Sequence, residues 1–441
     1  MSNTPDFLQP EYKAHAKQVK LVNDIYCGVD TAKAYLSQFN REEPTIYTQR
    51  QSDATLDNFV LGTVQTIKNI IFRKPITRNI TNTLLDTWLD TIDLKQNINE
   101  FAKDTLVNKE RDGFTYILVE APIIDSEKIT NKAQQEAENI RPYFVNILRS
   151  NVLNWKLDKF GNYERVSIRE QVEIQDGAFG VKIVNQIKVL YNDGRVQIWK
   201  ENEENPEEYI RGVKEITLIK IGKDSTPKFY GMAKINIVQF NRNSELDNYV
   251  RVGGAPFLAT FGTLDVEDGE TVTLGINQGL TFSDSDSDAK WIEMSGSNAE
   301  MIENRISKHN EQMLNIAIEF VSKDNTNKTA TEIQANKTED ESKLTDSATE
   351  LQEGLNQAIE LMSLYKLNTS FENQTLEVNK DFDSNVLTPE QASAYRLDYT
   401  QGIISLERLW ELYERGEYYP TTTEEEKAKE KSLISDADLG E

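Results

Sequence analysis

The sequence predicts an α+β fold that combines long helices with a separate run of strands, and three observations lead to this prediction. Residues 142–221 follow the two-residue period of strands. Residues 232–252, 296–322 and 329–370 carry apolar side chains at helical spacing. The apolar share is 38%, below the roughly 45–50% of average domains even when glycine is counted in place of tyrosine. We therefore expect an elongated molecule or one with much solvated helix surface.

Length and charge limit the class of protein further. The chain has 441 residues, which suggests about three domains at roughly 150 residues each. It carries 73 Asp and Glu against 49 Lys and Arg, a formal net charge of −24. A free-standing basic protein that reads nucleic acid is therefore not expected.

Targeting and cysteine content point to assembly in a reducing compartment. Residues 1–7 do not resemble an export signal, and no stretch approaches the ~18 apolar residues of a membrane span. Cys27 is the only cysteine, so an intrachain disulfide and a cysteine-built zinc site are excluded. We expect a chain that assembles in the cytosol without contact with a membrane.

The two histidines, His15 and His309, restrict enzymatic functions. His309 is expected to be a packed helix residue because it falls at helical spacing with other apolar positions. Those positions are Ile302, Ile306, Met313 and Phe320. No activated serine or cysteine motif, phosphate-binding loop or dinucleotide glycine pattern is present. The sequence thus predicts no catalytic residue and no cofactor.

Residues 10–110 are predicted to be mostly helical. Two amphipathic stretches stand out, and Pro75 closes the first because proline disfavours a helical predecessor. The first contains Leu56, Phe59, Val60, Val64, Ile67 and Ile71; the second contains Leu94, Ile98, Phe101, Leu106 and Val107. Asp112-Gly113 then leads into a strand predicted over 114–120.

The β-rich region spans 142–221. Its predicted strands cover 143–148, 166–174, 181–190, 195–199 and 215–221. Asn192-Asp193-Gly194 lies between two of these strands and is a strong hairpin-turn signal.

A first long helix is predicted over 232–252, followed by an acidic β module over 253–295. The predicted apolar side of the helix comprises Ile235, Val238, Arg242, Leu246 and Tyr249. The module carries eight acidic residues and one lysine, a net charge of −7, and strands are predicted over 257–261, 271–274 and 291–294.

Two further long helices follow, separated by a short polar segment. The helix over 296–322 opens with a capping-box pattern at Ser297 and Glu300. Residues 323–328, Lys-Asp-Asn-Thr-Asn-Lys, have no apolar anchor and are predicted to form an exposed loop. The third helix covers 329–370, with its apolar stripe at Ile333, Leu344, Ala348, Leu351, Leu355, Ile359 and Met362.

The last 71 residues, 371–441, form an acidic end with 17 acidic and 7 basic side chains. Helices are expected after Thr388-Pro389 and after Ser405, because a hydroxyl N-cap precedes helix formers at each place. The charged string beyond Pro420 is predicted to be a solvated helix or a disordered tail.

An acidic repeat at 283–288 is the most conspicuous candidate for metal binding. Asp284, Asp286 and Asp288 alternate with serines, as the first ligands of a calcium loop do. Ala289 stands where such a loop needs glycine, and Ser295 where it needs glutamate. We therefore expect a solvated loop tip and no metal site.

Several short strings stand in a fixed order along the chain. They are Pro10-Glu11-Tyr12, Phe72-Arg73-Lys74-Pro75, Ile92-Asp93-Leu94, Arg141-Pro142-Tyr143, Asn154-Trp155, Arg169-Glu170, Leu274-Gly275-Ile276-Asn277, Trp291-Ile292-Glu293, Thr329-Ala330-Thr331-Glu332 and Gly402-Ile403-Ile404-Ser405. Together with the order of elements, these strings resemble the portal proteins, or head-to-tail connectors, of tailed bacteriophages.

The resemblance implies a portal-type fold and assigns each region a place in it. Residues 1–231 would form the wing, with a helical N-terminal part and the β-rich 142–221. The stem helices would be 232–252 and 296–322, flanking the clip at 253–295. The tunnel loop would be 323–328, the long wing helix 329–370, and the crown with its acidic tail 371–441.

The function implied by the resemblance is structural. Portals form a ring, usually of twelve subunits, at one capsid vertex, and double-stranded DNA passes along its axis during packaging and ejection. The implied partners are the major capsid and scaffolding proteins, the large terminase and head-completion or adaptor proteins. The protein would be assembled in the cytoplasm of a host bacterium and reside in the virion.

Candidate functional residues follow from this resemblance. Lys323, Asp324, Asn325, Thr326, Asn327 and Lys328 would face DNA in the channel. Asp284, Asp286 and Asp288 would lie on the partner-docking clip. An acidic channel suits a conduit, because each lysine or arginine on phosphate would add affinity that opposes sliding.

Two alternatives stay open at this point. Another phage head-tail protein, such as an adaptor or minor capsid protein, would share the acidic α+β composition. It would lack the order helix, β module, helix, loop, helix. An acidic metal-dependent nuclease is the more distant alternative and would cleave DNA in the presence of divalent metal.

Overall fold

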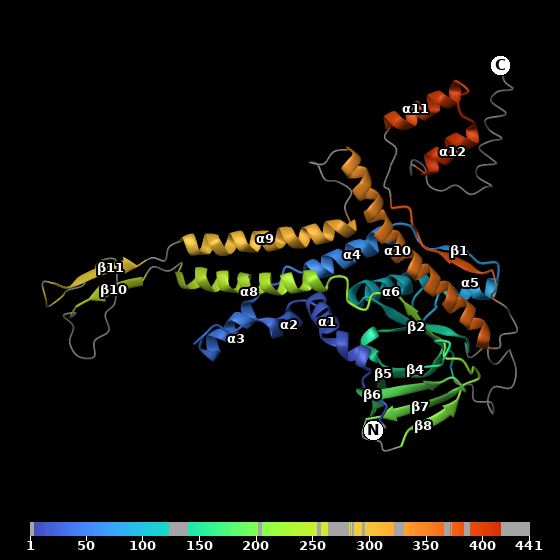
Figure 1. The fold of residues 1–441 in the computed structure, drawn as a ribbon, viewed down its shortest axis with the longest axis horizontal. Helices are drawn as coiled ribbons and strands as arrows, with labels where there is room; N and C mark the ends of the chain where they lie inside the picture. Colours follow the sequence, from blue (N-terminus) through green and yellow to red (C-terminus); the bar gives the residue numbers. More distant parts are fainter. Residues whose placement is uncertain are drawn as a thin grey trace. The chain divides into compact units, whose positions relative to one another are not determined.

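The computed structural model has a mixed α+β fold, which confirms the predicted class (Figure 1). It describes residues 4–122, 140–201, 205–253, 257–262, 282, 284, 286–292, 296–321, 330–365, 371, 373–382 and 389–415. The chain divides into two compact units, Met1–Lys380 and Asp381–Glu441. None of the helices in these described ranges is long and apolar enough to cross a membrane.

The N-terminal part of the first unit is helical, as predicted. Its α-helices are α1 (Pro10–Tyr26), α2 (Val29–Ala32), α3 (Pro44–Asp53), α4 (Phe59–Ile71), α5 (Thr83–Leu89) and α6 (Ile98–Asp112). Asn58, Asn82 and Asn97 cap α4, α5 and α6, and each side chain accepts hydrogen bonds from backbone N–H groups of the first turn. These asparagines fix where the helices begin.

The β-rich region forms two antiparallel sheets. The smaller has the order β3-β2-β9, from β2 (Thr115–Glu120), β3 (Tyr143–Ile147) and β9 (Leu218–Ile221). The larger has the order β4-β5-β6-β7-β8. Its strands are β4 (Val152–Leu157), β5 (Tyr163–Asp176), β6 (Gly180–Tyr191), β7 (Arg195–Lys200) and β8 (Glu207–Ile210). One apolar core joins the two sheets, and it includes Tyr116, Leu118, Ile147, Val152, Val166, Ile168, Leu190 and Val196.

The long helix α10 (Ala330–Met362) packs with α6 against the three-stranded sheet. Its predicted stripe is confirmed from Leu344 onward, where Leu344, Ala348, Leu351, Leu355, Ile359 and Met362 are all buried. Gly354 lets the helix approach β9 closely, because an added Cβ there would lie 2.5 Å from Cγ1 of Ile221. The sheet is thus covered by the sandwich core on one face and by helices on the other.

Two antiparallel helices, α8 (Tyr230–Gly253) and α9 (Gly296–Val321), run side by side (Figure 1). They are connected through a hairpin of β10 (Phe257–Phe261) and β11 (Asp288–Ile292). The predicted stripe of α9 is buried or half-buried at its described positions, and His309 is buried within it as expected.

The predicted apolar side of α8 is half-buried at Ile235, Leu246 and Tyr249 but is wrong at its other two positions. Val238 is 46% exposed and Arg242 is exposed, whereas the polar Asn236 and Gln239 are fully buried. The reason is a set of hydrogen bonds to the segment before α4. Asn236 Nδ2 donates to the Asp57 carbonyl at 2.8 Å, and Gln239 Nε2 donates to the Asp57 carboxylate. Buried amides therefore replace part of the apolar stripe.

A two-stranded sheet of β1 (Thr77–Asn79) and β12 (Thr375–Glu377) joins distant parts of the first unit. Residues 371 and 373–380 belong to this unit, whereas the C-terminal part was predicted to begin at 371. In the second unit, α11 (Pro389–Thr400) contacts α12 (Leu406–Arg415). Ser405 Oγ accepts a hydrogen bond from the Arg408 N–H at 3.2 Å, which confirms the predicted cap.

Candidate subunit-contact and docking surfaces

The helix pair α8–α9 exposes several large apolar side chains. Val238 and Val250 on α8, and Met301, Leu314 and Ile318 on α9, all face solvent in the single chain. Scattered apolar side chains are ordinary on a protein surface, but these five lie on two packed helices of a strongly acidic chain. This arrangement is suited to contact with another protein surface.

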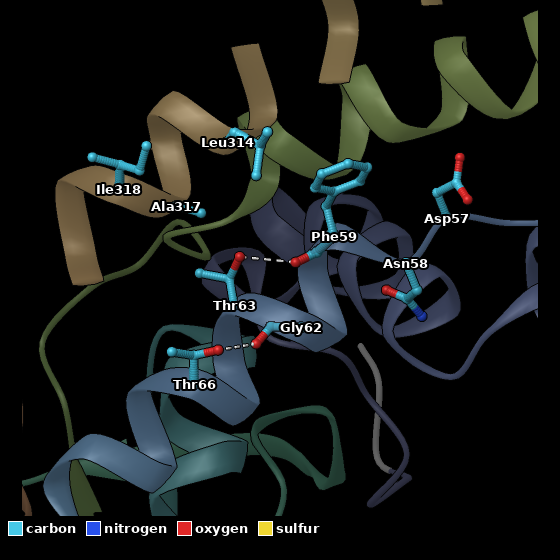
Figure 2. Close-up of a pocket in the computed structure, with 9 residues that line it drawn as sticks. All are labelled: Asp57, Asn58, Phe59, Gly62, Thr63, Thr66, Leu314, Ala317 and Ile318. Atoms are coloured by element: carbon cyan, nitrogen blue, oxygen red, sulfur yellow. Dashed lines mark hydrogen bonds between the residues drawn. The ribbon is translucent and has the colours of Figure 1, made fainter. Parts of the chain in front are cut away.

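An apolar groove lies between α4 and α9 (Figure 2). It has a volume of about 440 Å³, and residues 57–59, 62, 63 and 66 line one side. Leu314, Ala317 and Ile318 of α9 line the other side. The hydroxyls of Thr63 and Thr66 donate to carbonyls of their own helix, each at 2.8 Å. The groove walls thus offer mainly carbon to a ligand or partner.

The β10–β11 hairpin carries the predicted acidic residues. Asp284 and Asp286 are exposed, and a turn forms where the Ser287 N–H donates to the Asp284 carbonyl at 3.2 Å. Asp288 lies at the first position of β11 and pairs with Lys290 at 2.9 Å. The hydrogen bond from Lys290 holds the pKa of Asp288 below its ordinary value. The three residues are therefore exposed at and just before the start of β11.

The same hairpin exposes apolar side chains that sequence reasoning did not single out as functional. Phe261, Trp291 and Ile292 are all exposed, and Trp291 is 63% accessible. Phe261 lies opposite Asp288 in the strand register. A large aromatic side chain beside carboxylates gives the hairpin both an apolar and a charged contact. The signal for these side chains is the apolar string Trp291-Ile292, which also predicts a strand and forms part of the resemblance.

The second set of predicted site residues lies outside the described residues. This set comprises Lys323, Asp324, Asn325, Thr326, Asn327 and Lys328, between the end of α9 and the start of α10.

A buried ionic junction connects three elements and was not predicted. It joins Lys109 and Glu110 of α6, Lys228 just before α8, and Ser347 and Glu350 of α10. The two lysine ammonium groups lie 2.9 and 3.1 Å from the Glu110 carboxylate, and the Ser347 hydroxyl donates to it at 2.7 Å. Lys109 also lies 2.9 Å from Glu350. Every buried charge in the junction thus has an opposite partner.

Electrostatics in the junction favour full ionisation. Burial opposes the charge on Glu110, but Lys109, Lys228 and the hydrogen bonds outweigh burial and lower its pKa to about 2. Burial likewise opposes the charge on Lys109, and the carboxylates of Glu110 and Glu350 outweigh it and raise the lysine pKa. The junction is therefore an ionic link between α6, the start of α8 and α10, in which each charge favours the ionised form of its partner.

His309 lies on the α9 stripe rather than in a pocket with a nucleophile. Burial lowers its pKa, and Arg305 and Arg242 lower it further. Arg242 comes from α8, so the imidazole lies near the interface of the two helices. Among the residues that the structure describes, no group of three or more His, Cys, Asp or Glu side chains is placed to hold a metal ion.

Comparisons with known proteins give one family match within the chain. A family model described as a domain of unknown function (DUF4055) matches residues 228–366. This range begins at Lys228 and covers α8, the hairpin, α9 and α10. No curated protein matches the chain.

Among solved structures, the chain is similar to chains of gene transfer agent (GTA) particles. One is from the neck of an empty GTA particle computed with C6 symmetry. It has 13% sequence identity and a TM-score of 0.42, and the match covers 87% of this chain and 95% of that chain. Another is from the neck of a native GTA particle computed with C12 symmetry, with 13% identity, a TM-score of 0.41, and coverage of 82% and 90%. A third is from a native GTA virion, with 13% identity, a TM-score of 0.41, and coverage of 88% and 97%. At this level of similarity no function is transferred to the chain.

Proposed function

We propose that this chain is a portal protein, which forms a ring at one vertex of a phage capsid and conducts double-stranded DNA. The observation that carries the proposal is the helix pair α8–α9, which brackets a β hairpin, precedes the long α10 and exposes apolar side chains. This element order is the one implied by the sequence resemblance to portals. Amphipathic helices that keep apolar side chains in solvent gain stability when a neighbouring subunit covers them.

Charge supports the same role. A ring of chains that each carry a net charge of −24 would surround DNA with a mostly repulsive wall. Few phosphate contacts would then form, so DNA could slide in either direction. In the proposed ring, 323–328 reaches the channel, and its two lysines give bands of weak, salt-screened contact with phosphate.

The β10–β11 hairpin is the proposed docking platform for the packaging motor and, later, head-completion proteins. Its carboxylates Asp284, Asp286 and Asp288 are exposed and available to basic partner surfaces. Phe261, which lies opposite Asp288 in the strand register, would supply an apolar anchor beside that carboxylate, as aromatic side chains do at interface hot spots.

Mass and imaging of the purified protein test the proposal. A ring of twelve 50.4-kDa chains would weigh about 605 kDa in native mass spectrometry. Negative-stain images should show a flanged ring with a central hole. Monomers or dimers alone, both in solution and in virions, would refute the proposal.

Order of assembly separates a portal from an adaptor. A portal is needed before packaging, so heads made without this chain should contain no DNA. An adaptor joins afterwards, and heads lacking it would fill and then leak. DNA-filled heads without the chain would therefore favour the adaptor.

A further inference from the structure

The β5–β6 hairpin extends beyond its sheet as a two-stranded arm, residues 171–185. β4 pairs with β5 only as far as Ile168, and the ladder between β6 and β7 begins at Gln186. Between these limits β5 and β6 pair with each other through Asp176 and Gly180. Every residue from 171 to 183 is exposed. Among the described strands, the arm has no third strand beside it.

Apolar side chains occupy both faces of this arm. The register places Val172 opposite Val184 and Ile174 opposite Lys182 on one face, and Ile183 opposite Glu173 on the other. Val181 lies on the second face as well, and Phe179 at the tip is fully exposed. A two-stranded ribbon is marginally stable in water without a covering surface. Apolar side chains on both faces indicate that the arm inserts into a partner rather than lying flat on it.

The same chain has a matching surface in the α4–α9 groove. Leu314 and Ile318 in this groove are 50% and 37% exposed, and the volume of about 440 Å³ accommodates an aromatic side chain. Asp57 at the groove provides a carboxylate that complements Lys182 of the arm. The exposure of Phe179, Leu314 and Ile318 means that arm and groove do not cover each other within one chain.

We propose that the arm of one chain docks in the α4–α9 groove of a second copy, with Phe179 inserted between α4 and α9. An apolar knob and an apolar pocket at different places on one chain make a head-to-tail contact. Such contacts repeat from copy to copy and close into a ring when the rotation permits. The inference rests on the proposed ring and adds to it the contact that links neighbouring subunits.

Cysteine cross-linking tests this contact directly. In a background where the exposed Cys27 is replaced by serine, the variant carries Phe179→Cys and Ala317→Cys. A short thiol-to-thiol reagent should then give a ladder of dimers, trimers and higher multimers on a denaturing gel. Each single-cysteine variant can give dimers at most. The matched control replaces Phe160, which is 77% exposed at the β4–β5 turn, in place of Phe179 and should give no ladder.

Substitution without cross-linking provides the second measurement. The double substitution Phe179→Ser and Ile183→Ser should raise the protein concentration needed for ring formation about tenfold or more, because interface aromatics are frequent hot spots. Phe160→Ser should leave it unchanged.

Native mass of the unmodified chain separates the two ideas. If it forms no ring, the proposed portal function fails and the arm contact fails with it. If it forms a ring while the double cysteine gives no ladder, only the arm–groove contact is overturned. Rings of normal stability in the double serine variant would also overturn the arm–groove contact. If those rings form normally but fail to join capsid protein, the arm contacts capsid protein instead, and the proposal is overturned.

Discussion

Replacement of Glu110 by glutamine should destabilise the first unit by about 3 kcal/mol at pH 7. The magnitude follows from the pKa of Glu110, which the junction lowers from 4.5 to about 2, since each pKa unit corresponds to about 1.4 kcal/mol. Removal of one member of a buried ion pair typically costs about 3–5 kcal/mol, in agreement with this value. The amide would leave the ammonium groups of Lys109 and Lys228 without their shared carboxylate.

The assay is urea unfolding followed by tryptophan fluorescence, at one fixed protein concentration so that assembly contributes equally to both proteins. The matched control is Glu100→Gln on the same helix, whose carboxylate pairs with Lys103 at 2.7 Å but is 54% exposed. Its effect should be within about 0.5 kcal/mol.

The effect of pH provides the decisive comparison. A carboxylate with a lowered folded-state pKa stabilises the protein above the unfolded-state pKa of 4.5, and this stabilisation disappears as pH falls towards 2. The difference between Glu110→Gln and the unmodified protein should therefore be constant from pH 7 to about 5 and shrink below that. Equal losses in the Glu110 and Glu100 variants, or a loss that persists to pH 2, would show that the junction does not act through charge.

Three further outcomes are expected. Gly354→Val should destabilise the first unit by about 1–3 kcal/mol in the same urea assay, and Ile221→Ala should recover part of that loss, because the added carbons would collide with Ile221. Conversion of Asp284, Asp286 and Asp288 to asparagine should reduce the binding of basic partners in a pull-down over a salt series and leave the ring mass unchanged. Unaltered packaging and head completion would mean that these carboxylates serve only solubility. Alanine at both lysines of 323–328 should leave rings intact and change packaged genome length or DNA leakage, and normal values for both would limit the loop to a steric role.

Periodicity predicted most of the regular elements and missed those whose side chains do not alternate. The predicted strands at 143–148, 166–174, 181–190 and 195–199 correspond to β3, β5, β6 and β7. β8 was missed because this exposed edge strand begins with two glutamates, which seldom mark a strand. β4 was missed because Asn154 interrupts its apolar run. This asparagine is nevertheless buried, because its amide donates hydrogen bonds to the carbonyls of Pro5 and Phe7.

The candidate contact surfaces and the ionic junction were harder to predict, because they depend on neighbours that are distant in the sequence. Lys109 and Glu110 look like solvated helix residues until α10 covers them. The arm was predicted as two strands, but its exposure follows from where β4 and β7 stop pairing. The groove likewise requires the approach of α9 to α4, which no local pattern encodes. The exposure of Asp284, Asp286 and Asp288 could be predicted from their acidic character alone, because exposure needs no partner, and their docking role stays a prediction.

The ionic junction also imposes an order on folding during synthesis. Its hydrogen bonds join residues 237 positions apart, from Glu110 to Ser347. At about 5–20 residues per second, a ribosome needs roughly 10–50 s to make that length of chain. Until then Glu110 lacks the Ser347 hydroxyl and Lys109 lacks the Glu350 carboxylate, so burial of these charges would be incompletely compensated. We therefore expect α6 to complete its packing only after α10 has been synthesised, and a chain complete through α10 to be the first that can present finished surfaces to its neighbours.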